Sequence, residues 1–344
     1  MMIRASVVGA SGYTGGELVR WLCRHPAVML GHLTAHQNAG QPLSAVLPGF
    51  RDVVDRVLDE ADWVRLGAES DVVFLALPHG AALAAAPAIM AGGGRVIDLG
   101  ADFRLRDAAV YGRWYGLEHT APEALAEAVY GLPECWRAGI QGARLVANPG
   151  CYPTAAALAL LPLAEAGLVA GPVSVDGKSG ASGAGRGLAL GLHYSEVNEN
   201  LRAYNVGRHR HTPEMEQTLA DAGAASLVMF APHLVPMTRG LLCTCYVRLA
   251  APLDQDEAMA LYCRRYAGEP FVRVLSDELP QTKATLGSNF CDVTVRVDAE
   301  RGVAVAMAAI DNLGKGAAGQ AIQNMNLMFD RPETEGLWTA AVYP

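Results

Sequence analysis

The sequence has no surplus of basic residues. It contains 27 Lys and Arg against 35 Asp and Glu, so its formal net charge is −8. Proteins that bind nucleic acids gather Lys and Arg on one face to neutralise phosphates. The stretch Arg208-His209-Arg210-His211 is too short to form such a face. We therefore expect no nucleic-acid partner.

A long apolar run is also lacking. The most apolar stretch, residues 155–170, is interrupted by Pro162 and Glu165. It is shorter than the roughly 20 residues that cross a bilayer. The N-terminal residues show no basic start, apolar run and small-residue cleavage site of a secretory signal. We expect a cytoplasmic protein with no membrane partner.

Cysteine occurs seven times, and this odd number in a long chain argues against a disulfide framework. No Cys/His cluster has the spacing of a structural zinc site, so we expect no metal. Cys243 and Cys245 occupy alternate positions of a predicted strand. We expect both to pack on the same face of that strand.

Strand-like and helix-like segments alternate through the first 150 residues. This order predicts a Rossmann-type doubly wound parallel sheet. After Cys151 the strands have fewer helices between them, which predicts an α+β domain with a mostly antiparallel sheet. The predicted strands cover residues 3–9, 28–34, 71–77, 95–99, 144–148, 173–176, 240–249, 271–275, 292–297 and 303–310, and the predicted helices cover residues 14–24, 154–166, 253–266 and 316–329.

Two domains are expected, because 344 residues exceed what one hydrophobic core commonly holds. We expect the helix at 316–329 to return to the first domain. Residues 1–148 and 315–344 then form a dinucleotide-binding domain. Residues 149–314 form a domain for catalysis, substrate binding and oligomerisation.

A glycine-rich turn follows the first predicted strand and opens the first predicted helix. Its glycines allow a tight turn, close approach of a pyrophosphate, and close packing of helix on strand. Free N–H groups at the helix start hold the phosphates. The alternative is a turn that binds no ligand. The predicted cofactor-binding residues here are Gly9, Ser11, Gly12, Tyr13, Thr14 and Gly15.

No acid stands at the end of the second predicted strand, where the sequence reads Thr34-Ala35-His36. NAD enzymes place Asp or Glu there to bind the ribose hydroxyls. The missing carboxylate favours NADP(H), with Thr34 and His36 near the ribose. Pro78 and His79 follow another parallel strand, so we expect them near the cofactor too.

Cys151 is the candidate nucleophile. Pro149-Gly150 ends a strand and Pro153 suits a first helical turn, which places Cys151 at a helix N-terminus. The positive end of a helix stabilises a thiolate, the form needed for covalent acyl chemistry. The alternative is a buried, inert cysteine.

A general base is predicted at His209 or His211, just before a helix whose cap we expect to be Thr212. Histidine titrates near working pH and can accept the thiol proton. The alternative is a solvated basic loop. The glycine-rich loop 177–186 is expected to order around phosphate or nicotinamide, and the alternative is a flexible loop. Arg104 and Arg239 offer guanidinium groups for a carboxylate or phosphate, although each alone is more typical of a surface ion pair.

Taken together, these segments resemble the N-acetyl-gamma-glutamyl-phosphate reductase family of arginine biosynthesis, related to aspartate-semialdehyde dehydrogenase and the glyceraldehyde-phosphate dehydrogenase fold. The resemblance covers essentially the whole chain in family order. It rests on residues 9–15, 98–105, 130–134, 148–154, 178–186, 195–200, 209–214, 232–240, 311–316 and 335–337.

This resemblance implies that Cys151 attacks a small acyl phosphate and expels phosphate, that NADPH reduces the resulting thioester, and that a semialdehyde is released. We prefer His211 as the acid/base and keep His209 as a substrate-binding residue or alternative base. The family has Ser-Arg where this chain has Ala35-His36, which leaves the strength of the NADP preference open. The resemblance also implies a homodimer or homotetramer, substrate binding by Arg104, Asn148, Ser179 and Arg239, and cofactor binding by Ser182, Gly183 and Asn312.

Two other interpretations remain open at this stage. A related reductase of lysine biosynthesis acts on aminoadipyl or glutamyl phosphate linked to a carrier protein. Alternatively, the chain is a non-catalytic regulator that binds a dinucleotide. Residues 148–153 and 195–200 favour the arginine-pathway enzyme over the lysine-pathway reductase. The presence of Cys151, His209 and His211 argues against a non-catalytic regulator.

Overall fold

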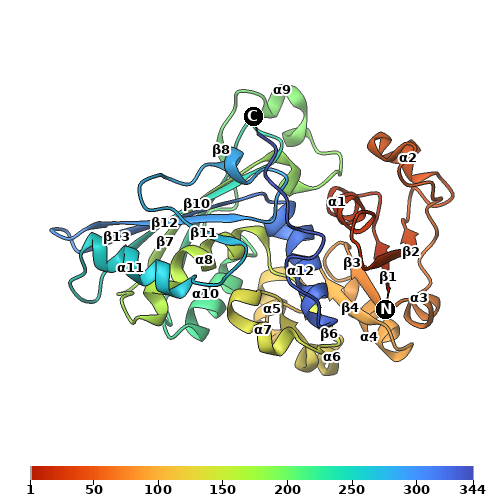
Figure 1. Cartoon of the computed structure of the whole chain (residues 1–344), viewed down its shortest axis with the longest axis horizontal. Coiled ribbons are helices and arrows are strands. Elements are labelled where there is room, and N and C mark those ends of the chain that lie inside the picture. The colour runs from red at the N-terminus through yellow and green to blue at the C-terminus, as the bar shows by residue number, and fades with distance from the viewer. Residues whose placement is uncertain (1, 344) are drawn as a thin grey trace. The chain divides into compact units, whose positions relative to one another are not determined.

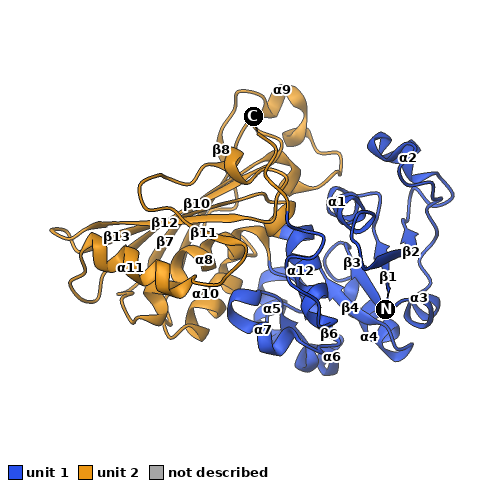
Figure 2. Ribbon diagram, in the orientation of Figure 1, with its two compact units in different colours: residues 1–149, 317–338 blue, residues 150–316, 339–344 orange. Residues whose placement is uncertain are grey.

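The computed structural model describes residues 2–343 and consists of two compact units (Figure 2). The first unit contains Met1–Pro149 and Ala317–Trp338, and the second contains Gly150–Gly316 and Thr339–Pro344. The chain passes from the first unit to the second between Pro149 and Gly150, one residue before the candidate nucleophile.

Six parallel strands form the sheet of the first unit (Figure 1). They are β1 (Ile3–Val8), β2 (Val28–Thr34), β3 (Val72–Leu75), β4 (Arg95–Asp98), β5 (Val129–Tyr130) and β6 (Leu145–Ala147). Their spatial order is β2-β1-β3-β4-β6-β5, and every neighbouring pair is parallel. The predicted doubly wound sheet is therefore confirmed. The order reverses at β1, which pairs with both β2 and β3, and dinucleotides bind at the carboxyl ends of strands beside such a point.

The helices of the first unit cover this sheet. Ala86 and Ile89 of one of them, α4, belong to the same fully buried apolar cluster as Val73 of β3, and α12 packs against α1, α7 and β4. The helices are α1 (Tyr13–Leu22), α2 (Leu43–Val46), α3 (Trp63–Glu69), α4 (Ala82–Ala91), α5 (Ala108–Tyr115), α6 (Pro122–Glu127), α7 (Pro133–Ile140) and α12 (Gly319–Met328), with a short 3-10 turn, η1 (Pro48–Phe50).

Seven strands form the sheet of the second unit. They are β7 (Val173–Ser179), β8 (Arg202–Ala203), β9 (Val228–Leu234), β10 (Leu241–Arg248), β11 (Val272–Val274), β12 (Cys291–Asp298) and β13 (Val303–Ile310). Their order is β11-β12-β13-β10-β7-β9-β8. Only the β11–β12 and β7–β9 pairs are parallel, so the mostly antiparallel sheet expected from the sequence is confirmed.

Strand β9 was not predicted, because Pro232 lies within it and proline cannot donate to a strand ladder. Its carbonyl is still used, since it accepts a hydrogen bond from the Tyr204 N–H at 3.0 Å. Cys243 and Cys245 of β10 are both fully buried on one face, which confirms the prediction that they pack there.

Helix α8 (Cys151–Glu165) is the central helix of the second unit. It packs against β10, β12 and β13, and every residue from 152 to 164 is buried. Figure 1 shows α8, α10 and α11 on the same side of the sheet. The other helical segments are α9 (Tyr194–Val197), α10 (Thr212–Asp221), α11 (Gln255–Arg265), the 3-10 turns η2 (Ala181–Ala184), η3 (Leu190–Leu192) and η4 (Thr282–Thr285), and a π-helical segment, η5 (Gly314–Ala318). Among residues 2–343, no helix combines the length and apolar character of a membrane span.

Candidate active site

The glycine-rich turn joins β1 to α1 as the sequence predicts. The N–H groups of Gly9 and Ala10 donate to the Thr34 carbonyl at 3.0 and 2.9 Å, which ties the turn to the end of β2. Gly9 has φ +82°, and a Cβ placed there would lie 2.3 Å from the Ala76 carbonyl oxygen. A Cβ at Gly15 would lie 2.1 Å from the Gly9 oxygen. The protein's own packing therefore requires both glycines.

Gly12 is different from these two glycines. A Cβ at Gly12 would meet one atom within 4 Å, the Gly9 oxygen at an ordinary 3.4 Å, and its φ of −81° suits any residue. Helix α1 starts at the next residue with no side-chain cap and no acid in its first turn, so its first N–H groups have no intrahelical acceptor. The free space around the Gly12 Cβ position, at the start of this helix, fits the close approach of a pyrophosphate.

The other predicted cofactor residues of the first unit lie after neighbouring strands. Thr34 is buried at the end of β2, whereas His36 is exposed. Asp59, remote in sequence, forms an isolated bridge with Thr34, and its carboxylate lies 3.5 Å from His32 Nδ1. A carboxylate thus approaches the edge of β2 from another segment, which the local sequence did not reveal.

The loop containing Pro78 and His79 is fixed by a buried carboxylate. Asp102 accepts hydrogen bonds from the Gly80 N–H at 2.7 Å and from the Ala82 N–H at 3.0 Å at the start of α4. The Tyr111 hydroxyl also donates to Asp102, at 2.8 Å. The His79 ring contacts the Tyr115 ring, with 5.2 Å between centroids. Asp102 was predicted only as part of a family segment, and its structural role comes from contacts across the sequence.

Asn148 and Arg104 are buried together in the first unit. The Asn148 N–H donates to the Asp98 carbonyl at 2.8 Å, and its carbonyl accepts from Arg104 Nε at 2.8 Å. Its side chain donates to the Ala317 carbonyl and accepts from Asn324, both at 3.1 Å. Arg104 Nη2 donates to the Leu99 carbonyl at 2.9 Å. These contacts fix the chain three residues before Cys151.

Cys151 is the first residue of α8, three residues before the predicted start of that helix, and it is half-buried. Gly150 is the N-cap, and its N–H donates to Glu214 Oε1 at 2.8 Å. The Gly150 carbonyl accepts from the N–H and hydroxyl of Thr154 at 2.9 and 3.0 Å. A Cβ at Gly316 would lie 2.8 Å from the Cys151 Cβ, so this glycine makes room for Cys151. The thiol stands at the positive end of a helix, where a thiolate is stabilised.

The two candidate histidines lie beside the residue that follows the nucleophile. The Tyr152 ring is buried, and its centroid lies 5.8 Å from the His209 ring and 6.1 Å from the His211 ring. The centroids of the two imidazole rings are 4.7 Å apart. The cap prediction was wrong: His211, not Thr212, is the N-cap of α10, and no side chain caps the helix. Glu214, three residues later, reaches Gly150, so one short segment contacts the nucleophile helix at two places.

His209 is neutral at pH 7. Burial lowers its pKa to about 4, and the neighbouring Arg210 charge adds to this shift. Its Nδ1 accepts a hydrogen bond from the His211 N–H at 3.2 Å, so the neutral ring carries its proton on Nε2. Burial also raises the pKa of the Tyr152 hydroxyl well above its usual range.

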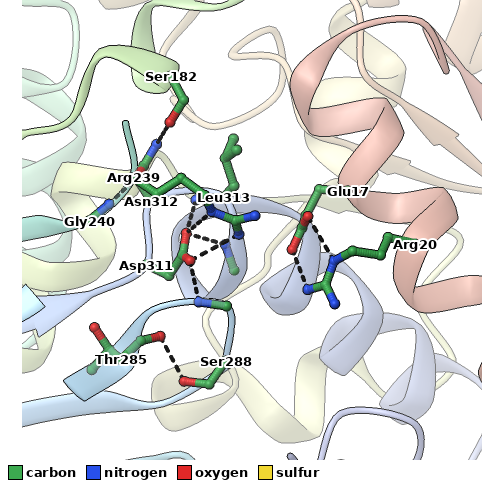
Figure 3. A network of polar contacts seen from close by, with 12 residues as sticks. Glu17, Arg20, Ser182, Arg239, Gly240, Thr285, Ser288, Asp311, Asn312 and Leu313 are labelled. Carbon is green, nitrogen blue, oxygen red and sulfur yellow. Dashed lines mark hydrogen bonds and ion pairs between the residues drawn. The ribbon is translucent and has the colours of Figure 1, made fainter. Parts of the chain in front are cut away.

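The remaining predicted residues lie in the loops of the second unit that Figure 3 shows in part. Asn312 Nδ2 donates to Ser182 Oγ at 2.9 Å, and Asn312 Oδ1 accepts from the Gly240 N–H at 2.8 Å. Ser179 is buried, and its hydroxyl donates to the Gly180 carbonyl at 3.1 Å. A Cβ at Gly183 would lie 3.0 Å from that hydroxyl. Ser179, Ser182, Gly183 and Asn312 are therefore brought into neighbouring loops.

Two groups of predicted residues thus assemble, one within each unit. Glu214, Asp102 and Asp311 lie in family segments, but sequence reasoning gave none of them a role. Each is a carboxylate with at least one partner outside its own segment. The sequence signal for Glu214 was its place in the first turn of a helix, which predicts capping of that same helix rather than contact with another.

Both units match family models. Residues 4–143 match a model described as the NAD binding domain of semialdehyde dehydrogenase. Residues 151–312 match a model described as the dimerisation domain of semialdehyde dehydrogenase.

Full-length relatives have a common name. The N-acetyl-gamma-glutamyl-phosphate reductase of Symbiobacterium thermophilum is 56% identical to this chain, and that of Desulforudis audaxviator is 52% identical, with 100% of both chains covered in each comparison. A crystal structure of aspartate semialdehyde dehydrogenase with NADP from Candida albicans matches with a TM-score of 0.70 over 95% of this chain and 98% of that one. Its sequence identity is 16%, so this likeness concerns the fold alone.

Replacing Gly12 by alanine should separate ligand binding from folding. We expect Gly12→Ala to weaken NADPH binding by about tenfold or more with little change in the free energy of unfolding, because the new methyl group meets ligand rather than protein. Gly15→Ala is the matched control, expected to destabilise the fold by roughly 2 kcal/mol or more through its clash with Gly9. NADPH titration and urea unfolding test this, and equal NADPH affinity in Gly12→Ala and the parent would refute it.

The buried His209 should make stability depend on pH. Its folded-state pKa of about 4 lies below the ordinary 6.5, so between these values the unfolded chain binds a proton that the folded chain does not. The free energy of unfolding should therefore fall as pH drops from 6.5 to 4, by up to roughly 3 kcal/mol from this group. In urea unfolding, His209→Gln should lose this part of the slope, whereas His36→Gln at an exposed site should keep it. An unchanged slope in His209→Gln would contradict the assignment.

Proposed function

This chain belongs to the N-acetyl-gamma-glutamyl-phosphate reductase family, and from that membership we propose that it reduces N-acetyl-L-glutamyl 5-phosphate to N-acetyl-L-glutamate 5-semialdehyde and phosphate, with NADPH, in arginine biosynthesis. The observation that carries the proposal is the placement of Cys151. It is the first residue of a buried helix, and two imidazoles pack on the residue that follows it.

We propose Cys151 as the nucleophile. Its Sγ forms a bond to the acyl carbon, the bond from that carbon to the phosphate oxygen breaks, and phosphate leaves with the electron pair. The start of α8 favours the thiolate that this attack requires. The product of this step is a thioester on Cys151.

We assign the acid/base role to His211 and a binding role to His209. A group with a pKa of about 4 is too weak a base to remove a thiol proton at neutral pH, which argues against His209. His209 instead offers its Nε2–H to the substrate as a neutral donor. His211 takes the thiol proton and returns a proton to the substrate oxygen.

NADPH, when bound, supplies the hydride that reduces the thioester carbon. Collapse of the resulting hemithioacetal breaks the carbon–sulfur bond, releases the semialdehyde and restores the thiolate of Cys151. The turn from Gly9 to Gly15 is proposed to hold the cofactor phosphates through the first N–H groups of α1. In the first unit, Thr34 and His36 are proposed near the ribose, and Pro78 and His79 are further proposed cofactor-binding residues. In the second unit, Ser182 and Gly183 are proposed to bind the cofactor and Asn312 to bind the nicotinamide.

The buried contacts of Arg104 and Asn148 support a positioning role for both residues. Each donates to backbone carbonyls inside the first unit, and together they fix the approach to Gly150. Direct binding of the substrate phosphate by either side chain stays a prediction. Ser179 and Arg239 are the proposed substrate-binding residues of the second unit.

We propose that residues 1–148 with 315–344 bind the dinucleotide and that residues 149–314 provide catalysis and self-association. A homodimer or homotetramer is the proposed assembly. Support comes from the match of residues 151–312 to a dimerisation domain and from exposed Met229 and Tyr246 on the sheet of that unit. A cytoplasmic location is proposed with it.

Replacing Cys151 by alanine should abolish turnover. We expect a loss of about three orders of magnitude or more, with NADPH binding unchanged within about twofold, because the thiol forms the covalent intermediate. The assay follows NADPH formed from the semialdehyde, phosphate and NADP+. Cys263→Ala, at an exposed cysteine, is the matched control and should keep full activity. Parallel loss of turnover and NADPH binding in Cys151→Ala would indicate misfolding. In that case, alkylation of the thiol in the parent protein identifies the nucleophile.

The two histidines should differ in their effect on rate. We expect His211→Asn to lower kcat by about 100-fold or more, since general acid–base groups contribute on that order. His209→Asn should raise KM for the semialdehyde more than it lowers kcat, because His209 binds as a neutral donor. Steady-state kinetics across pH 6 to 9 measures both effects. A larger kcat loss in His209→Asn would reverse the assignment.

A further inference from the structure

Asp311 is a buried carboxylate at the end of β13 with partners on three segments. It is 0% exposed. Its Oδ2 accepts from the Gly287 N–H at 2.6 Å, and its Oδ1 accepts from the N–H groups of Leu313 and Gly314 at 2.8 and 3.2 Å. Figure 3 shows Leu313 and Arg239 beside the Asp311 carboxylate. Three backbone donors hold the side chain in one orientation.

Two guanidinium nitrogens of Arg239 contact this carboxylate. Its Nε lies 3.2 Å from Asp311 Oδ1, and its Nη2 lies 2.9 Å from Oδ2. The fork of an arginine matches a carboxylate in this geometry, and paired contacts fix direction as well as distance. The Arg239 side chain is 22% exposed, whereas its partner is completely buried. The carboxylate is thus completely buried, whereas the arginine side chain is partly exposed.

The residue next to Asp311 fixes the same loop from the other side. Asn312 accepts from the Gly240 N–H, adjacent to Arg239, and donates to Ser182. Gly240 has φ +112°, and a Cβ there would lie 2.8 Å from Thr282 Cβ, so this position of the turn requires glycine. Consecutive residues of one strand end therefore hold both the backbone and the side chain of Arg239.

We propose that Asp311 is a positioning residue that presents the Arg239 guanidinium to an anionic group of the substrate. This inference rests on the proposed function, whose substrate carries two such groups, a carboxylate and a phosphate. A long arginine side chain loses many rotamers when it binds an anion, and a fixed buried partner imposes that restriction before binding. Removing the carboxylate should therefore weaken anion binding without changing the nucleophile.

The test is the reverse reaction of Asp311→Asn, in which the two anions come from different substrates. We expect KM for either phosphate or the semialdehyde to rise by about tenfold or more. A rise for phosphate assigns the phosphate group to Arg239, and a rise for the semialdehyde assigns the carboxylate. KM for NADP+ and the rate of Cys151 alkylation by iodoacetamide should change by less than about twofold.

Asp292→Asn is the matched control. Asp292 is also a buried carboxylate of the second unit paired with an arginine, at 2.6 Å from Arg273 Nε, and it should leave both KM values unchanged. Asp311→Ser is the second variant if the asparagine protein does not fold, because a serine hydroxyl can still accept from the Leu313 N–H.

A double-mutant cycle with Arg239→Gln shows whether Asp311 acts through that arginine. The double variant should have an affected KM less than about twofold above that of Arg239→Gln alone. Unchanged KM values in Asp311→Asn, or an effect that persists in full without Arg239, would overturn the inference. Absence of turnover in the parent protein would instead contradict the proposed function.

Discussion

The hydrogen bond from the Gly150 N–H to the buried Glu214 carboxyl group is the interaction on which the proposed catalytic arrangement depends. It fixes the residue immediately before Cys151, and its acceptor lies one turn into the helix that starts after His211. Gly316 and Gly177 leave the space that this arrangement needs. Without them, a Cβ would lie 2.8 Å from Cys151 Cβ and 2.5 Å from the Tyr152 ring. The same contacts therefore hold Cys151, the proposed nucleophile, and the segment of His209 and His211, the proposed acid/base residues.

The same principle operates elsewhere, because buried polar side chains hold the loops that carry exposed functional groups. Asp102 fixes the Pro78–Gly80 loop, Asn148 fixes the approach to α8, and Asp311 fixes Arg239. An unpaired buried carboxylate is costly, so Asp102 and Asp311 each accept hydrogen bonds from several donors. The Asn148 amide both donates and accepts. Asp98 shows the alternative response to burial. Burial, together with the nearby Asp102, raises the pKa of this carboxyl group to about 7. This shift stabilises the neutral acid relative to the carboxylate.

Local sequence predicted the features that depend on neighbouring residues. The strand before Gly9, the glycine turn and the helix after it form one continuous segment, and alternating burial in β10 follows from residues two apart. Strand β9 was not predicted, because Pro232 argues against a strand. In the fold, β9 nevertheless pairs in parallel with β7. The contact of Glu214 with Gly150 was not predicted, since nothing in its segment indicates a donor 64 residues earlier. Arg104 and Asn148 were recognised by type, but their partners became evident only in the folded unit.

The proposed reaction requires a covalent bond between Cys151 and the acyl group of the substrate. Mass spectrometry of the protein mixed with N-acetylglutamyl phosphate in the absence of NADPH tests it most directly. The peptide that contains Cys151 should gain the mass of one N-acetylglutamyl group, and this adduct should disappear on addition of NADPH as the semialdehyde forms. An unmodified Cys151, or an adduct on another residue that turns over with NADPH, would contradict the account.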